Sequence, residues 1–398
     1  MAEFSFNPWD PEFRANPYPA YELLRQGPPH MLQLPRGQLV FVARYEDVDA
    51  LLDDAENLSN VRMLPREVLL VGPFGGAQTM LTSDPPDHSR LRRLVSRDFT
   101  PKRIRDLEPE IRALTGELVN KLSAQNGDFE VMRDLAIPLP VMVISRMLGI
   151  EPENYETFKR WSDAIVSGNN PTLGGAAATD FRHAVEAIRG YFTAEIEKRR
   201  RQPGEDLVSA LVAAHDDDEA LTEDELLAFV VLLLLAGNET TTTLIGNGLL
   251  ALARNRDQLE RLRAEPALMP KAIEELLRYD APVQAVLRFT RQDINLRGTD
   301  VPAKTAVFLA LAAANRDPAQ FAHPDTLDLG RTPNNHVAFG HGIHFCLGAS
   351  LARLEAAIAI DAVLERFPRL CLAEPTKRID YRGSFALRSP DAIRMLTG

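Results

Sequence analysis

The stretch HVAFGHGIHFCLGASLARLE, residues 336–355, places a cysteine between glycines directly before an expected helix. The whole chain holds two cysteines and eight histidines, and three of those histidines lie in this stretch. A buried free thiol at Cys346 would explain the cysteine but not the glycines around it. A zinc site formed by His341, His344 and Cys346 lacks a second Cys or His pair at conventional spacing elsewhere in the chain.

A third possibility, a thiolate ligand to haem iron, accounts for more of this stretch. Glycines allow the backbone to approach a flat group closely. A helix that begins just after Cys346 would aim N–H groups and the positive end of its dipole at the sulfur, which stabilises a thiolate. We therefore favour the haem thiolate and keep the free thiol and the zinc ligand as alternatives.

Residues 339–348, FGHGIHFCLG, match the pattern F-G-x-G-x-H-x-C-x-G at every fixed position. This segment resembles the haem-binding loop of the cytochrome P-450 family, the haem-thiolate monooxygenases. Three further segments resemble that family in the expected order. They are DPPDHSRLR at 84–92, similar to the propionate-binding segment, AGNETT at 236–241, similar to the oxygen-activation stretch, and ELLR at 275–278, similar to the E-x-x-R pair.

The resemblance covers most of the chain and implies the family's fold. That fold is mainly α with small β-sheets (α+β), with a long central helix over a haem and the thiolate loop beneath it. The implied cofactor is haem b, with O2 as co-substrate and Cys346 as the axial ligand of the iron. The other cofactor-binding residues implied are Phe339, Gly340, Gly348 and Ala236, together with His88, Arg92, Arg288 and His344 for the propionates.

The resemblance also assigns catalytic, structural and substrate-binding roles. Thr240 would donate and accept hydrogen bonds near bound O2, as a hydroxyl can, and Glu239 would control proton entry. Glu275 and Arg278 would form a buried pair locked by a third arginine, for which Arg331 is the candidate. The substrate pocket would be lined by apolar side chains, which favour a lipophilic guest: Val231, Val283, Val286 and Phe385.

Hydrophobic spacing predicts a largely helical chain. Thr222 and Glu225 fit a capping box, with Leu221 and Leu226 as a hydrophobic staple, so a helix should begin there. The segment AGNETTTT, residues 236–243, contains residues that are poor in the interior of a helix. It predicts that this helix weakens at its midpoint, which would indicate a site. The alternative is that Gly237 only permits close packing. Further helices are expected at 46–54, 103–122, 180–201 and 351–367, and short strands at 39–43, 294–298 and 305–311. A mobile loop is expected at 172–180. The whole chain, 1–398, is expected to form one domain.

Composition excludes several classes of protein. The net charge of −11 disfavours nucleic acid as a partner, and two cysteines can form neither a disulfide framework nor an iron–sulfur cluster. The longest apolar run, 228–237, is far short of the roughly 20 residues of a membrane span, and the N-terminus does not resemble a signal peptide. We expect a soluble, cytoplasmic monomer, in which Cys371 is a structural thiol.

The expected activity is insertion of one atom of O2 into a lipophilic small molecule, with two electrons from NAD(P)H. The chain has no G-x-G-x-x-G fingerprint after a strand, so electrons must come from a ferredoxin or flavodoxin with its reductase. Residues 90–105 hold seven basic residues and one acid, and we expect this partner to dock near Arg90, Arg93 and Arg97.

The substrate is expected among fatty acids, terpenoids, steroids and macrolides, and Arg62 or Arg66 could pair with a substrate carboxylate. In relatives that use peroxide directly, the acid–alcohol pair is often missing. Its presence here, as Glu239 and Thr240, favours the O2-dependent reaction. The alternatives are a peroxygenase or lyase on the same scaffold and, outside enzymes, a haem-based ligand sensor.

Overall fold

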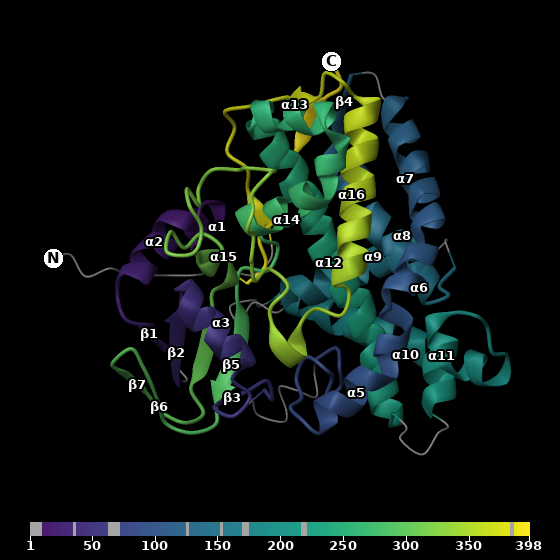
Figure 1. Cartoon of the computed structure of the whole chain (residues 1–398). Coiled ribbons are helices and arrows are strands. Elements are labelled where there is room, and N and C mark those ends of the chain that lie inside the picture. Colours follow the sequence, from purple (N-terminus) through teal and green to yellow (C-terminus); the bar gives the residue numbers. More distant parts are fainter. Residues whose placement is uncertain are drawn as a thin grey trace. The chain divides into compact units, whose positions relative to one another are not determined.

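The computed structural model describes residues 10–34, 37–62, 72–124, 127–151, 154–168, 175–215, 221–382 and 386–398 (Figure 1). Its chain forms two compact units. The first unit comprises Met1–Ser59, Thr115–Ala136 and Thr240–Gly398, and the second comprises Asn60–Leu114 and Ile137–Glu239. The single domain expected over 1–398 stays a prediction.

The largest sheet of the first unit runs in the order β1-β2-β8-β5-β3. Its strands are β1 (His30–Leu34), β2 (Gly37–Val42), β3 (Leu58–Ser59), β5 (Val286–Thr290) and β8 (Ala306–Leu309). Strand β2 pairs in parallel with β8, and the other neighbours are antiparallel. The strands expected near residue 40 and within 305–311 are confirmed as β2 and β8. Strand β5, which carries Arg288, was not expected.

Short helices and smaller sheets complete the first unit. The helices are α1 (Pro11–Ala15), α2 (Tyr18–Gln26), α3 (Tyr45–Asp53), α13 (Arg256–Ala264), α14 (Met269–Tyr279), α15 (Leu311–Ala314) and α16 (Ala349–Arg366). The small sheets are β6 (Ile294–Leu296) with β7 (Thr299–Val301), β10 (Tyr381–Arg382) with β11 (Ser389–Pro390), and β4 (Asp128–Glu130) with β12 (Arg394–Leu396) and β9 (Cys371–Leu372). Helices α3 and α16 and strand β6 confirm expectations from the sequence.

The second unit is helical in its described residues. It holds α5 (Asp87–Ser96), α6 (Pro101–Asp106), α8 (Pro138–Met147), α9 (Tyr155–Gly168), α10 (Ala176–Arg201) and α11 (Leu207–His215). Helices α9 and α10 pack on each other through an aromatic cluster that includes Phe158 and Tyr191, whose ring centroids are 4.8 Å apart. Part of the loop expected at 172–180 is helix, because α10 begins at Ala176, and part lies outside the described residues.

The helix expected over 103–122 is divided into α6 and α7 (Glu108–Ser123). Pro109 is the second residue of α7. A proline lacks an N–H and its ring clashes with the preceding helical turn, so it suits a helix start but interrupts a longer helix. Helix α7 begins in the second unit and ends in the first.

Helix α12 (Glu223–Arg254) is the longest helix that the structure describes, and it too passes from the second unit to the first. Its capping box is confirmed, since Thr222 N donates to Glu225 Oε2 at 2.8 Å and Glu225 N donates to Thr222 Oγ1 at 3.2 Å. The expected weakening at 236–243 is wrong, because the helix continues unbroken. Burial explains this, since tertiary packing outweighs weak local propensity.

The burial of α12 decides whether this apolar helix is a membrane span or a core helix. By length and composition it could cross a membrane, but 78% of its most apolar window is buried inside the protein. It is therefore a core helix. A Cβ placed on Gly237 would lie 3.3 Å from the side chain of Ile144 on α8, which confirms that this glycine permits close packing.

Candidate functional site

Cys346 lies at the end of a loop of tight turns that leads directly into α16. Gly340 N donates to Val337 O at 2.9 Å, and Phe345 N donates to Gly342 O at 3.0 Å. Cys346 N donates to Phe339 O at 3.0 Å, which ties the cysteine back to the start of the loop. Gly340 and Gly342 have φ of 69° and 65°, a left-handed conformation that glycine adopts without strain. Gly340 and Gly342 therefore shape the loop, and the side chain of Cys346 is exposed.

Glu274 on α14 binds one side chain of the loop, His336, and one of α16, Arg353. His336 Nδ1 accepts from Ala338 N at 3.2 Å, so Nε2 carries the proton and donates to Glu274 Oε2 at 3.1 Å. Arg353 donates to the same carboxylate at 2.6 and 2.8 Å and lies over the ring of Phe339, 4.5 Å from its centroid. Burial raises the pKa of Glu274, but the hydrogen bonds from Arg353 and His336 and the charge of Arg353 outweigh it and hold the pKa at about 2. His336, which had no assigned role, is thus an anchor of the loop.

A second anchor lies on α3. His341 Nδ1 is 3.3 Å from Asp49 Oδ1 and 3.4 Å from Asp53 Oδ2. A Cβ on Gly342 would meet the Asp53 carboxylate, which is 53% exposed and can turn away, so the positive φ is the main reason for this glycine. Among the described residues, which include His341, His344 and Cys346, no group of three or more His, Cys, Asp or Glu side chains could hold a metal ion. The zinc alternative is therefore not supported.

Glu275, Arg278 and Arg331 form the buried network that the sequence predicted. Glu275 and Arg278 have fully buried side chains and are joined by two hydrogen bonds of 2.8 Å. Arg331 Nε donates to both oxygens of Glu275 at 3.1 and 3.0 Å. Asp328 N and Asn334 Nδ2 also donate to this carboxylate, at 3.0 and 3.2 Å. The structure therefore brings together all three residues assigned to this network.

Arg288 and His344 are the propionate-binding candidates of the first unit. Arg288 lies on β5 and is 7% exposed, with Nη1 donating to Leu287 O at 2.9 Å. His344 ends the 3₁₀ turn Gly342–His344 and is half-buried. A guanidinium can bind a carboxylate through two parallel N–H groups, so the chemistry of Arg288 fits a propionate.

Gly348 offers a separate test of whether this loop fits a haem. Its φ is −84°, which any residue adopts, and a Cβ there would meet no atom of the described residues within 4 Å. Neither backbone conformation nor packing explains the glycine, whereas clearance for a flat group against the loop does. The donor set of one thiol, one buried arginine and one histidine fits a haem with anionic propionates.

His88 and Arg92 are the propionate-binding candidates of the second unit. They lie one turn apart on α5 and therefore share a face of that helix. His88 is 2% exposed, and burial lowers the pKa of its imidazole, as does the neighbouring charge of Arg92. A neutral imidazole still has one N–H to donate to a carboxylate, so His88 keeps the chemistry that the resemblance assigns to it.

Glu239 lies in a buried polar cluster. It is 5% exposed, and its Oε1 is 3.4 Å from Lys159 Nζ and 3.5 Å from Ser162 Oγ. Asn238 Nδ2 donates to the same serine hydroxyl at 3.4 Å. Lys159 also pairs with Asp163, whose side chain is 42% exposed. This cluster therefore links a buried carboxylate to a partly exposed one, and the neighbouring Thr240 is half-buried. Lys159 and Ser162 were missed, since both are more than seventy residues from Glu239 in the sequence.

The predicted pocket residues lie in different settings. Val231 on α12 is fully buried, and Val286 at the start of β5 is half-buried. Val283 forms an isolated antiparallel bridge with Leu387.

Among the residues predicted to bind the cofactor, Ala236 is exposed on α12 and Phe339 is half-buried. Phe385 and Arg66 lie outside the described residues, and Arg62 is exposed.

Comparison with known proteins shows the family of this chain. The sequence profile described as Cytochrome P450 matches residues 16–393. The chain belongs to the cytochrome P450 family. This P450 is 41% identical to the Vitamin D(3) 25-hydroxylase of Pseudonocardia autotrophica, over 97% of its own chain and 95% of the relative. It is 42% identical to the cytochrome P450 monooxygenase PikC of Streptomyces venezuelae, over 91% and 86%.

Solved structures give the same fold. The myxobacterial P450 CYP267B1, in complex with myristic acid, superposes with a TM-score of 0.90 at 37% identity, covering 98% of each chain. The Bacillus subtilis P450 PksS superposes with a TM-score of 0.90 at 34% identity, covering 99% of this chain and 100% of that one. The predicted fold and family are therefore confirmed, and this P450 is an oxidoreductase of a family that uses haem.

The basic stretch 90–105 differs from expectation at one position. Arg90 Nη2 donates to Glu225 Oε1 at 2.5 Å, so its charge is already engaged with the capping residue of α12. Arg93 and Arg97 are exposed, as are three further basic residues of the stretch: Lys102, Arg103 and Arg105. The exposed basic side chains of the stretch therefore include Arg93 and Arg97 but not Arg90.

Proposed function

We propose that this P450 is an O2-dependent monooxygenase that inserts one oxygen atom into a lipophilic small molecule, using two electrons from NAD(P)H. The observation that carries the proposal is the pair Glu239–Thr240 on α12, with Glu239 held buried by Lys159 and Ser162. An acid placed beside an alcohol on a buried helix is the arrangement that controlled proton delivery requires. The alternatives that use peroxide have no need of it.

In this proposal Cys346 is the thiolate ligand of haem b. Arg288 and His344 bind propionates, as do His88 and Arg92. When bound, the haem supplies the iron at which O2 is reduced, and in this family the thiolate pushes electron density that favours O–O cleavage. The loop turns that fix Cys346 and the anchors at Glu274 hold that sulfur in place.

Proton delivery is assigned to this chain's own side chains. Asp163 is partly exposed and pairs with Lys159, which also contacts Glu239. A proton from solvent would pass along these groups to the Glu239 carboxylate, and the Thr240 hydroxyl would hand it on. The burial of Glu239 excludes bulk water from that last step, which limits the waste of electrons as peroxide.

The electrons are proposed to come from a ferredoxin or flavodoxin and its reductase. The exposed basic side chains between residues 93 and 105, among them Arg93 and Arg97, would attract the acidic surface of such a partner. Electrostatic attraction of this kind acts mainly on the association rate and weakens as salt rises. The location is proposed to be the cytoplasm, with the chain acting as a monomer and with no nucleic-acid or membrane partner.

Thr240→Ala tests the proposal. With NADPH, a ferredoxin and its reductase, and a lipophilic substrate, the variant should bind haem normally, form less product per NADPH and release more hydrogen peroxide. Thr243→Ala, one turn further along α12, is the matched control and should change neither ratio. Unchanged product per NADPH in Thr240→Ala would contradict the proton-delivery role. Full turnover with peroxide alone, and none with NADPH and partner, would establish the peroxygenase alternative instead.

A further inference from the structure

The first unit contains a hollow of about 480 Å³ that is open to solvent, which we call the arginine hollow. Its wall is formed by the end of α2, the start of α3, the turn between β6 and β7 and the residues that follow α15. Its volume lies within the range of ligand pockets, about 300–1,000 Å³. The charged residues of the wall are Glu22, Arg25, Arg44, Glu46, Arg297 and Asp317.

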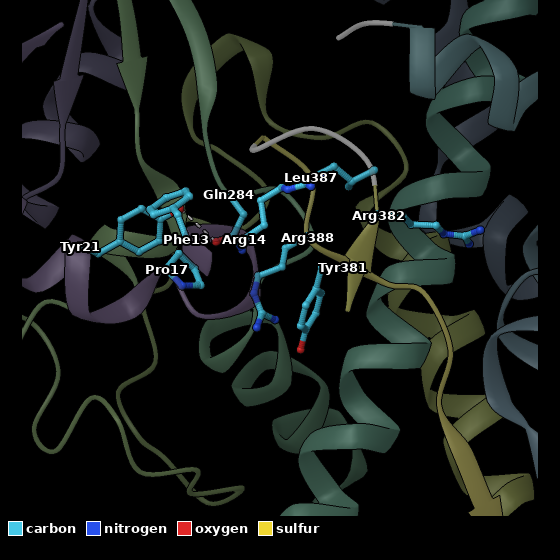
Figure 2. Close-up of a pocket in the computed structure, with 9 residues that line it drawn as sticks. All are labelled: Phe13, Arg14, Pro17, Tyr21, Gln284, Tyr381, Arg382, Leu387 and Arg388. Carbon is cyan, nitrogen blue, oxygen red and sulfur yellow. Dashed lines mark hydrogen bonds between the residues drawn. The ribbon is translucent and has the colours of Figure 1, made fainter. Parts of the chain in front are cut away.

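The hollow drawn in Figure 2 differs from the arginine hollow in size. It is lined by residues of α1, α2 and the β10–β11 hairpin, among others, and encloses only about 10 Å³, room for about one water. Arg388 in its wall pairs with Asp280 at 2.8 Å. This smaller hollow therefore has no space for a ligand, whereas the arginine hollow has.

Two of the three acids in the arginine hollow are bound by other groups of the chain. Asp317 accepts one backbone N–H on each carboxylate oxygen, at 2.8 and 2.9 Å. Glu46 pairs with Arg297 at 2.8 Å, and Arg297 also pairs with Asp47 at 2.6 Å. Arg297 is thus compensated by two carboxylates. The third acid, Glu22, is exposed, so solvent screens its charge.

Arg25 and Arg44 are half-buried and keep N–H groups that the chain does not use. Arg25 Nη1 donates to Ala313 O at 2.9 Å, and Arg44 Nε donates to Arg25 O at 2.8 Å. The second bond holds the guanidinium of Arg44 against the last turn of α2. The other N–H groups of both side chains have no hydrogen-bond acceptor among the described residues. Two guanidiniums therefore offer unused donors in one hollow.

The charge of Arg25 is not fully compensated by the chain's own acids. Burial lowers the pKa of Arg25, and the attraction of neighbouring carboxylates, to which Asp317 contributes most, does not offset this. The positive charge of Arg316 lowers the pKa of Arg25 further. A charge that burial disfavours is stabilised by an added partner of opposite sign. The hollow therefore favours an anion over a neutral molecule.

We propose that the arginine hollow binds a hydrophilic small molecule through a phosphate or carboxylate group. The free N–H groups of Arg25 and Arg44 bind this oxyanion, because the guanidinium fork matches the oxygens of both groups. The side chains of Gln26 and Gln320, which also line the hollow, are available to the rest of the molecule. A wall this rich in charged groups does not suit a lipophilic guest, so this site is separate from that of the oxidised substrate.

Calorimetric titration of the haem-loaded protein tests the site with two anions. Glycerol 3-phosphate carries a phosphate and succinate carries carboxylates, while glycerol is neutral and sodium chloride at matched ionic strength controls for screening. At least one of the two anions should bind with saturable heat, and glycerol and sodium chloride should not. Binding of glycerol 3-phosphate alone assigns a phosphate ligand, and binding of succinate alone assigns a carboxylate ligand.

Variants then locate the binding groups. Arg25→Met and Arg44→Met should each weaken binding at least about tenfold, the loss expected when hydrogen bonds to a charged group are removed. Arg44→Lys, which keeps the charge but not the fork, should retain part of the affinity. Gln320→Glu adds a negative charge at an exposed position of the wall and should weaken binding while both arginines stay in place. Far-UV circular dichroism shows whether each variant is folded.

Arg93→Met is the control, because Arg93 is an exposed arginine of the second unit. It should bind the anion as the wild type does. The proposal would be overturned if neither anion bound the wild type, or if Arg44→Met and Gln320→Glu bound it unchanged. A loss in Arg93→Met as large as that in Arg44→Met would also overturn it, since anions would then gather on exposed basic side chains in general. None of these results bears on the proposed monooxygenase reaction, which Thr240→Ala tests separately.

Discussion

Replacing Glu275 by glutamine removes one buried negative charge and little volume. In the wild type this carboxylate compensates Arg278, which is fully buried, and Arg331, whose side chain is 10% exposed. Backbone carbonyls also bind Arg278 Nη1, at 2.9 Å from Asn315 O and 2.8 Å from Pro324 O. Those carbonyls stay in the variant, but they are dipoles and cannot replace a full charge.

The expected cost follows from breaking a buried ion pair at one partner, which is about 3–5 kcal/mol. Since about 1.4 kcal/mol corresponds to one power of ten, the unfolding equilibrium constant should rise by about two to four powers of ten. The assay is equilibrium urea unfolding of the haem-loaded protein, followed by far-UV circular dichroism. The slope with urea should be unchanged, because the surface exposed on unfolding is the same.

Glu108→Gln is the matched control. Glu108 and Arg112 also form a Glu–Arg pair within one helix, but their side chains are 37% and 55% exposed. Surface pairs of this kind contribute about 0–1 kcal/mol, so this variant should unfold almost as the wild type does. If Glu275→Gln lost less than about 1 kcal/mol while keeping its haem spectrum, the account of this network as a charge-compensated core would be refuted.

Three further predictions concern other buried groups. Burial raises the pKa of Glu355 from 4.5 to about 8, so its contribution to stability is fully present below pH 4.5 and is lost as pH rises through about 8. Glu355→Gln should therefore flatten the fall in unfolding free energy between pH 5 and 8. An unchanged slope would contradict the pKa shift. Lys159→Met should lower product per NADPH and raise the release of peroxide, whereas Arg160→Met, at an exposed neighbouring residue, should do neither. If the two variants behave alike, Lys159 takes no part in delivering protons to Glu239. Gly342 has a φ of 65° and lies against Asp53, so Gly342→Ala should lower the free energy of unfolding in urea by about 1–3 kcal/mol. Adding Asp53→Ala should recover part of this loss. If nothing is recovered, the backbone conformation alone accounts for the loss.

Features whose cause is local in the sequence were predictable. The Cys346 loop, the capping box at Thr222 and Glu225 and the E-x-x-R pair each depend on residues a few positions apart, and each is confirmed as a structure. Arg331, the third member of the Glu275 network, was found only through the family resemblance. The roles of Cys346, Glu239 and Thr240 in the reaction remain predictions.

Features that depend on distant partners were not predictable from one sequence. His336 had no role predicted from the sequence, yet it bonds to Glu274, 62 residues away. Arg90 was assigned to a docking surface, yet it pairs with Glu225, 135 residues away. The weakening expected in α12 was wrong because helix propensity ignores the burial of most residues in 236–243. Cys371 was expected to be a structural thiol, but it is exposed on β9.

The central claim, that Cys346 is the thiolate ligand of a haem, is tested most directly by the visible spectrum of the reduced protein under carbon monoxide. The wild type and Cys371→Ser should both show the strongly red-shifted Soret band of a thiolate-ligated haem. Cys346→Ser should keep haem but lose that band. A folded, haem-loaded wild type without the shifted band, or a Cys346→Ser variant that retains it, would contradict the claim.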